Sequence, residues 1–184
     1  TTDDLTVRNC QIGVFSTRDR TSNSGAVRAT GVTVTSNQGP NSGNQVSNPI
    51  IENNEFVDIS CTGSVDSSNT DEDSKAKGLA LNGNIRNASI NNNDFLGIGA
   101  TSNDPSGAQD APDDNSAEGT AKPRGISFIK GGASTAPRSF TILDNTFGGT
   151  GSDAIEGTYG QPAIFLGGSG SLGEEEVYNN VFYH

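Results

Sequence analysis

The sequence predicts an all-β fold, a single parallel β-helix of about five coils that spans residues 1–184. Three observations support this prediction. The hexapeptide Ile/Val-x-x-Asn-x-Phe occurs four times. Short glycine-bounded apolar runs lie between its copies, and no helical period interrupts them. Only 30% of the residues are hydrophobic, which suits the thin core of a stacked repeat better than a compact helical globule.

The hexapeptide supplies the expected core. A degenerate copy, Val7-x-x-Cys10-x-Ile12, precedes the four intact ones. Asn tolerates the left-handed backbone of a bend, and Asn amides stacked on successive coils can bond to one another. Phe two residues later should stack into an aromatic ladder beside an aliphatic one. We therefore expect three internal ladders, formed by Ile51, Asn54, Phe56, Ile90, Asn93, Phe95, Ile142, Asn145, Phe147, Val177, Asn180 and Phe182.

The glycine-bounded runs supply further strands, because they are short, alternating and flanked by turn residues. They cover residues 25–31, 78–83, 125–131 and 161–167. This alignment sets Gly25 level with Gly78 and Gly125. In the last two runs the inward-facing residues are ambiguous by one position, and a slip of one residue would reverse the face.

Three polar, aperiodic segments are predicted to be surface loops that leave the corners of the coils. They are residues 35–48, 62–76 and 99–123. In the last of them Asp110, Asp113 and Asp114 could hold Ca²⁺ weakly, although no acidic run matches an EF-hand. No other cofactor is expected.

The chain carries 22 acidic and 11 basic residues and has a net charge of −11. Phosphate binding requires clustered Lys and Arg, so nucleic acid is not an expected partner. Anionic membrane surfaces are disfavoured for the same reason. No apolar stretch approaches the ~20 residues that span a bilayer, and membrane insertion is therefore not expected.

Two cysteines, Cys10 and Cys61, are too few to define a disulfide framework. In the proposed register they lie too far apart along adjacent coils for a relaxed bridge. Cys10 occupies the Asn position of the degenerate hexapeptide, where we expect a small buried filler. A bridge would require the first segment to fold back, and this alternative stays open.

The hexapeptides and glycine-bounded runs resemble the right-handed parallel β-helix repeats of the pectin-lyase-like superfamily. The resemblance covers nearly the whole chain outside the three predicted loops. It implies a right-handed coil and an extracellular or cell-surface location. Relatives of this kind include polysaccharide lyases, glycoside hydrolases, phage tailspikes, adhesins and surface structural proteins, so the fold alone does not select a function.

The first functional hypothesis is a structural subunit that assembles end to end into a filament or fibre, with other copies of the chain as partners. An open solenoid end exposes strand edges and core, and strand addition between subunits gives open head-to-tail assemblies. The hypothesis places these contacts at Leu5, Val7, Cys10, Ile12, Val177 and Phe182. Whether the chain is complete or part of a longer solenoid stays open.

The alternative is a carbohydrate-binding or polysaccharide-degrading β-helix, or a segment of a virus tail fibre. Arg124, Lys130 and Arg138 flank one glycine-bounded run and could line a groove for carbohydrate. Glu55 and Asp94 should stack on adjacent coils about 5 Å apart, where paired carboxylates could serve acid–base chemistry or hold a cation. The chain has one histidine, at its last position, so no Ser-His or Cys-His catalytic set can be proposed and an enzymatic role is the less favoured interpretation.

Overall fold

The computed structural model describes residues 2–18, 28–36, 45–64, 74–103, 121–129, 138–149, 155–157, 163–167 and 172–183. Every regular element in this part of the chain is a β-strand. All of the paired strands run parallel. The all-β class and the parallel sheets predicted from the repeats are therefore confirmed.

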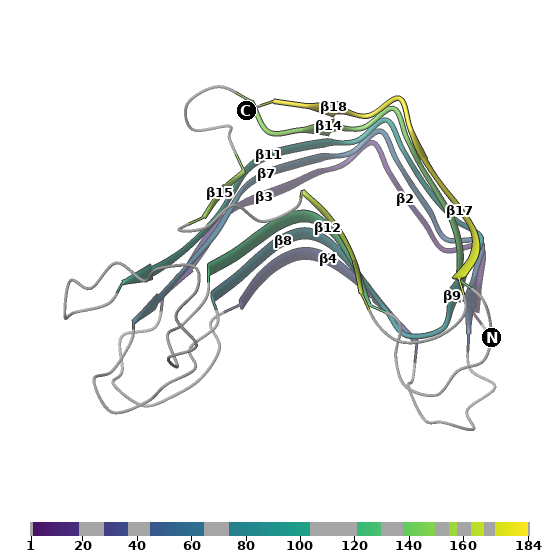
Figure 1. Cartoon of the computed structure of the whole chain (residues 1–184), viewed down its shortest axis with the longest axis horizontal. Coiled ribbons are helices and arrows are strands. Elements are labelled where there is room, and N and C mark those ends of the chain that lie inside the picture. Colours follow the sequence, from purple (N-terminus) through teal and green to yellow (C-terminus); the bar gives the residue numbers. More distant parts are fainter. Residues whose placement is uncertain are drawn as a thin grey trace.

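The strands form layers in which the chain visits the sheets in a fixed order (Figure 1). The first layer holds β1 (Thr2–Asp3), β2 (Thr6–Arg8), β3 (Gln11–Arg18) and β4 (Arg28–Thr35). The second holds β5 (Val46–Ser47), β6 (Ile50–Glu52), β7 (Glu55–Ser64) and β8 (Ser74–Asn82). The third holds β9 (Ile85–Arg86), β10 (Ala88–Asn91), β11 (Asp94–Asn103) and β12 (Ala121–Ile129).

The later layers continue the same sheets. The fourth holds β13 (Arg138–Leu143), β14 (Thr146–Phe147), β15 (Glu156–Gly157) and β16 (Ile164–Gly167). The last described strands are β17 (Leu172–Tyr178) and β18 (Val181–Phe182). Sheet A has the strand order β1-β5-β9, and sheet B has the order β17-β13-β10-β6-β2. Sheet C has the order β18-β14-β11-β7-β3, with β15 beside β11, and sheet D has the order β16-β12-β8-β4. This recurrence is consistent with a β-solenoid.

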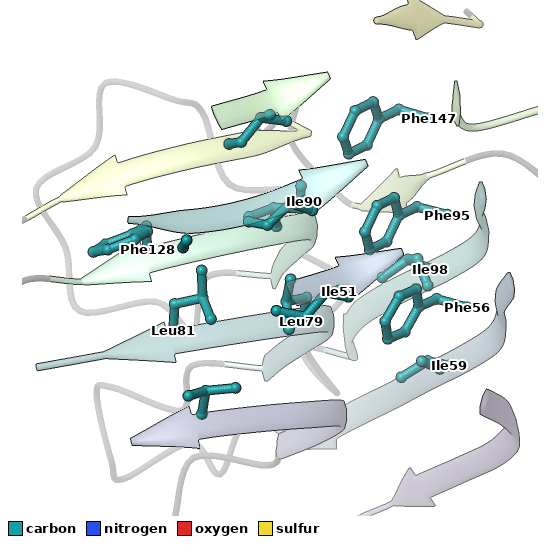
Figure 2. Close-up of a cluster of buried hydrophobic side chains, with 14 of the residues drawn as sticks. Ile51, Phe56, Ile59, Leu79, Leu81, Ile90, Phe95, Ile98, Phe128 and Phe147 are labelled. Carbon is teal, nitrogen blue, oxygen red and sulfur yellow. The ribbon is translucent and has the colours of Figure 1, made fainter. Parts of the chain in front are cut away.

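Aromatic and aliphatic columns fill the space between the sheets. The strand register joins Phe56, Phe95, Phe147 and Phe182 in sequence. Their ring centroids are 4.7, 5.0 and 5.0 Å apart, and successive ring planes differ by 10° or less. The first three rings form a visible column in Figure 2. The aliphatic hexapeptide positions are in register as well, and they form the column Val7, Ile51, Ile90, Ile142 and Val177.

A third column is made of the hexapeptide asparagines. Asn54, Asn93 and Asn145 are almost fully buried. The side-chain oxygen of Asn93 accepts from both the backbone N–H and the Nδ2 of Asn54 at 3.0 Å, and Asn93 Nδ2 donates to Asn145 Oδ1 at 2.9 Å. The same two bonds join Asn145 to Asn180. This asparagine ladder gives buried polar groups at the corner of the stack internal partners.

The left-handed backbone lies one residue before the asparagine ladder. In each intact hexapeptide the residue before the ladder asparagine has a positive φ: Asn53 (55°), Asn92 (50°), Asp144 (54°) and Asn179 (55°). All four are exposed. The expectation that the ladder asparagines themselves take up the bend is therefore corrected. The buried amides serve for hydrogen bonding, while the preceding residue accommodates the turn.

The strand register places Gly31, rather than Gly25, level with Gly78 and Gly125. This corrects the alignment inferred from the sequence, and Gly25 itself lies outside the described residues. A Cβ on Gly78 would lie 2.5 Å from Cδ1 of Phe95, and one on Gly125 would meet the next ring of the ladder at 2.6 Å. The aromatic column therefore fixes the glycine positions.

We expect Gly78→Ala to lower the free energy of unfolding by about 1–3 kcal/mol, because a stacked ring cannot move away from the added methyl group. Thermal unfolding measures this loss. The same change should cost less in a Phe95→Leu background, where the ring is gone. An equal cost in both backgrounds would contradict the steric explanation.

Strands extend into the edges of the predicted loops. Strands β7 and β11 end inside two of these segments, and β8 and β12 begin inside them. Ala76 and Ala100 face the core there and are fully buried, so polar neighbours can lie on the outer face of regular strands. The rest of the three segments, at 37–44, 65–73 and 104–120, lies outside the described residues.

Both cysteines are free thiols, and Cys10 is exposed while Cys61 is buried. The expectation of a buried Cys10 is therefore wrong. Within the described residues only the second layer packs against it, and its backbone N–H donates to Asn54 Oδ1 at 3.1 Å. Burial raises the pKa of Cys61 to about 11, so this thiol stays protonated and unreactive at neutral pH.

Candidate binding site

The outer face of sheet D is hollowed into a groove of about 510 Å³, which we call the basic groove. In Figure 1 strands β4, β8 and β12 arch toward sheet C, so that their other face is concave. The described residues that line the groove include no Asp or Glu. They are Arg28, Thr30, Thr33, Lys75, Lys77, Ala80, Asn82, Arg124, Ile129 and Phe165.

Strand alternation and the glycine column build this face. In β8, Ala76 faces the core and is fully buried, while its neighbours Lys75 and Lys77 line the groove. Leu79 after the glycine is again fully buried. The register between β8 and its neighbours skips Gly78, so each strand bends there and the outer face becomes concave.

The basic side chains are in register across the layers. Arg28 of β4 pairs with Lys75 of β8, and the backbone of Lys122 in β12 continues this row. Two residues along the strands, Lys77 pairs with Arg124. Neighbouring strands lie about 4.8 Å apart, so like charges are held close together along the stack. Such a row produces a strong local positive potential in a protein whose net charge is negative.

The guanidinium of Arg124 lies over an aromatic ring. Its guanidinium carbon lies 3.5 Å from the centroid of the Phe165 ring, and the residue is only 8% exposed. A guanidinium over a ring face is stabilised by the ring quadrupole. The structure also resolves the ambiguous register of the last two runs, since Phe128 faces the core and Phe165 faces the groove.

Lys77 shows the electrostatic cost of this arrangement. Burial, followed by repulsion from Arg124, Lys75 and Arg28, lowers the pKa of Lys77 to about 8. A positive charge at this position is therefore disfavoured in the absence of a ligand. A bound anion would offset both effects.

The low pKa predicts a pH dependence of stability. Between about 8 and the ordinary value of 10.5 the unfolded chain carries the proton on Lys77 and the folded protein does not. We therefore expect the contribution of Lys77 to the free energy of unfolding to rise as the pH is raised through this window. Cys61, whose pKa is raised from 9.0 to about 11, contributes in the opposite direction. The difference in the free energy of unfolding between the original chain and Lys77→Gln, which retains Cys61, should therefore grow with pH. Urea unfolding at a series of pH values measures both profiles. Identical profiles for the two proteins would contradict the lowered pKa.

The predicted carbohydrate residues that the structure describes do not lie in one groove. Arg124 lines the basic groove, whereas Arg138 begins β13 in sheet B. Glu55 and Asp94 are register neighbours in sheet C, where Glu55 Oε2 accepts from Gln11 Nε2 at 2.7 Å. Lys130 lies outside the described residues.

Sequence reasoning missed Arg28, Lys75 and Lys77. A signal was present: the glycine of each of the three layers follows a short basic segment, Arg-Ala-Thr, Lys-Ala-Lys or Lys-Pro-Arg. Alignment on Gly25 hid this repeat, because the correct first member is Gly31.

The ends of the ladders differ in exposure. Leu5, Val7 and Ile12 are partly buried against the core. At the other end the side chains of the last layer, which we call the C-terminal apolar layer, are about half exposed. They are Val177 (45%), Tyr178 (46%), Val181 (48%), Phe182 (55%) and Tyr183 (56%).

The described residues contain neither a cluster of metal-ligating side chains nor a membrane-spanning helix. No group of three or more His, Cys, Asp or Glu side chains there could hold a metal ion. The calcium candidates Asp110, Asp113 and Asp114 lie outside those residues. The same part of the chain contains no helix of the length and apolarity that crossing a bilayer requires.

No protein-family profile, curated protein or solved structure matches this chain. We therefore infer the function from the chemistry of the basic groove and of the C-terminal apolar layer.

Proposed function

We propose that the protein is an extracellular or cell-surface right-handed parallel β-helix of about five coils, and that its basic groove binds an acidic carbohydrate. The observation that carries this proposal is the composition of the groove. Four cationic side chains, Arg28, Lys75, Lys77 and Arg124, share one concave face with hydroxyl and amide groups. The described lining offers no carboxylate.

The charge distribution favours an anionic ligand. The chain has only 11 basic residues, and four of them line this one groove. Repulsion among them is unfavourable in the free protein, as the lowered pKa of Lys77 indicates. Charge-assisted hydrogen bonds to carboxylate or sulfate groups would convert this repulsion into binding energy.

The polar lining favours a carbohydrate over a nucleic acid. Thr30, Thr33 and Asn82 place hydroxyl and amide groups beside the cations, and these groups suit a ligand rich in hydroxyls. Single-stranded nucleic acids require exposed aromatic faces on which bases stack. The one aromatic side chain in the described lining, Phe165, has a ring face covered by Arg124.

Isothermal titration calorimetry with a uronic-acid oligosaccharide and the neutral hexose oligosaccharide of the same linkage tests the proposal. We expect the acidic ligand alone to bind, and Lys77→Gln to weaken binding by about tenfold or more. Arg8→Gln is the matched control, since Arg8 is an exposed cation of sheet B that pairs with Glu52 at 3.8 Å. Equal binding of acidic and neutral ligands, or an equal loss in both variants, would overturn the proposal.

A structural role through end-to-end contact is the second candidate, and the C-terminal apolar layer favours it. Phe182 stacks on Phe147 with one ring face and is 55% exposed. We propose that another β-layer covers this surface, as each described layer covers its neighbour. Sedimentation velocity and electron microscopy should show assemblies that Phe182→Asp dissociates. Monomers at all concentrations, for both proteins, would contradict this role.

A further inference from the structure

Lys77 has cationic neighbours on all three of the strands that form the arch of the basic groove. Arg124 of β12 is its register partner, and Lys75 lies two residues before it on β8. Arg28 of β4 is the register partner of Lys75. The described lining of the groove contains no carboxylate that could balance these charges. The arrangement therefore favours the neutral amine of Lys77 over the ammonium form.

A neutral lysine amine is a nucleophile. Lysines that are desolvated or adjacent to another cation are the ones that proteins use to form imines with carbonyl compounds. Lys77 is half-buried and lines the groove, so a ligand in the groove can reach its Nζ. With a pKa of about 8, roughly one tenth of this amine is neutral at pH 7, against about one part in 3,000 for an ordinary lysine.

The two register neighbours of Lys77 suit a carbonyl ligand that also carries an acidic group. On one side the guanidinium of Arg124 offers the planar donors that a carboxylate prefers. On the other side Thr30 of β4 is the register partner, and its hydroxyl lines the same groove. Adjacent strands are about 4.8 Å apart, so the three side chains can contact one sugar unit.

We infer that Lys77 is a covalent attachment site, at which Nζ condenses with the open-chain aldehyde at the reducing end of an acidic carbohydrate. The inference rests on the proposed binding of acidic carbohydrate in the basic groove and names the group of the ligand that reacts. Arg124 holds the carboxylate of the terminal sugar, while the aldehyde of that sugar meets the amine.

The condensation is balanced by the loss of one water molecule. Nζ forms a bond to the aldehyde carbon, and the carbonyl electron pair moves to the oxygen. Both protons of the neutral amine leave with that oxygen as water, and the Thr30 hydroxyl can transfer a proton between the nitrogen and the oxygen. An imine nitrogen is a weaker base than an amine, so the product relieves the repulsion among the cations.

Reductive trapping tests the inference on the full chain. A uronic-acid oligosaccharide with a free reducing end is incubated with the protein and sodium cyanoborohydride, which delivers a hydride to the imine carbon and leaves a stable secondary amine. Peptide mapping by mass spectrometry locates the sugar and separates lysine labelling from labelling of the α-amino group. At pH 7 we expect Lys77 to be labelled at least about tenfold faster than the other lysines, which are Lys75, Lys122 and Lys130.

The pH dependence gives a second readout. The ratio of Lys77 labelling to the labelling of the other lysines should fall as the pH is raised from about 7 to about 9, because an ordinary lysine gains proportionally more neutral amine over this range. Arg124→Gln removes both a repelling charge and the carboxylate contact, so it should slow Lys77 labelling at least about fivefold. Arg8→Gln, in sheet B, is the matched control and should leave the rate unchanged.

The alditol of the same oligosaccharide separates binding from condensation, because it keeps the carboxylates but has no aldehyde. If calorimetry shows that the alditol binds, and Lys77 is labelled no faster than the other lysines, the inference is overturned and the proposed function stands. If the alditol does not bind, the proposed function is overturned and the inference with it.

Discussion

Replacing Asn93 by alanine should lower the free energy of unfolding by roughly 2–4 kcal/mol. Asn93 is fully buried, and its oxygen is an acceptor for the backbone N–H of Asn54. Its Nδ2 group donates to Ile51, Asn91 and Asn145. Alanine leaves these groups in a buried corner where water cannot replace the lost amide. The loss should appear as a lower midpoint in urea and in thermal unfolding.

The neighbouring Asn92 provides the matched control. It is exposed, has a φ of 50° and donates to Asn53 Oδ1 at 2.6 Å. Glycine tolerates this backbone conformation, so Asn92→Gly should cost well under half of the Asn93→Ala loss. If both variants lose the same stability, the buried ladder is no more important than the exposed turn, and the explanation fails.

The sequence was sufficient to predict the ladders. The hexapeptide fixes residue types at constant offsets, and parallel layers must bring identical offsets into register. Phe56, Phe95 and Phe147 therefore stack as their spacing predicts. Asn54 and Asn93 pair for the same reason. Burial at such positions follows from local pattern alone, because each layer repeats the one before it.

The basic groove could not be predicted in this way. Lys75 and Lys122 fall within segments predicted to be loops, because polarity and lack of an apolar period are typical of loops. In the structure these segments begin as strands, in which small residues such as Ala76 meet the core. The concave shape also depends on the aromatic ladder, whose rings press against the strand glycines from within. The rings and the glycines belong to different sheets and to different segments of the sequence. No single segment therefore reveals this contact.

The geometry of Arg124 makes it the residue on which ligand binding should depend most. A guanidinium presents a planar set of donors suited to a carboxylate. The guanidinium carbon of Arg124 lies 3.5 Å from the centroid of the Phe165 ring, which supports it from one side. Lysine would keep the charge but has neither the planar donors nor the stacking surface. One substitution can therefore distinguish the effect of the groove's positive charge on binding from the effect of donor orientation.

We expect Arg124→Lys to weaken binding of a uronic-acid oligosaccharide by about tenfold or more, measured by calorimetry. Lys75→Arg, the reverse exchange in the neighbouring row, should change affinity little.

Phe165→Leu should also weaken binding. Adding Phe165→Leu to Arg124→Lys should reduce the affinity less than Phe165→Leu does in the original chain, because the ring acts through the guanidinium. Additive losses would show that Phe165 acts independently of Arg124. Unchanged affinity in Arg124→Lys would show that charge alone, rather than the guanidinium plane, determines recognition.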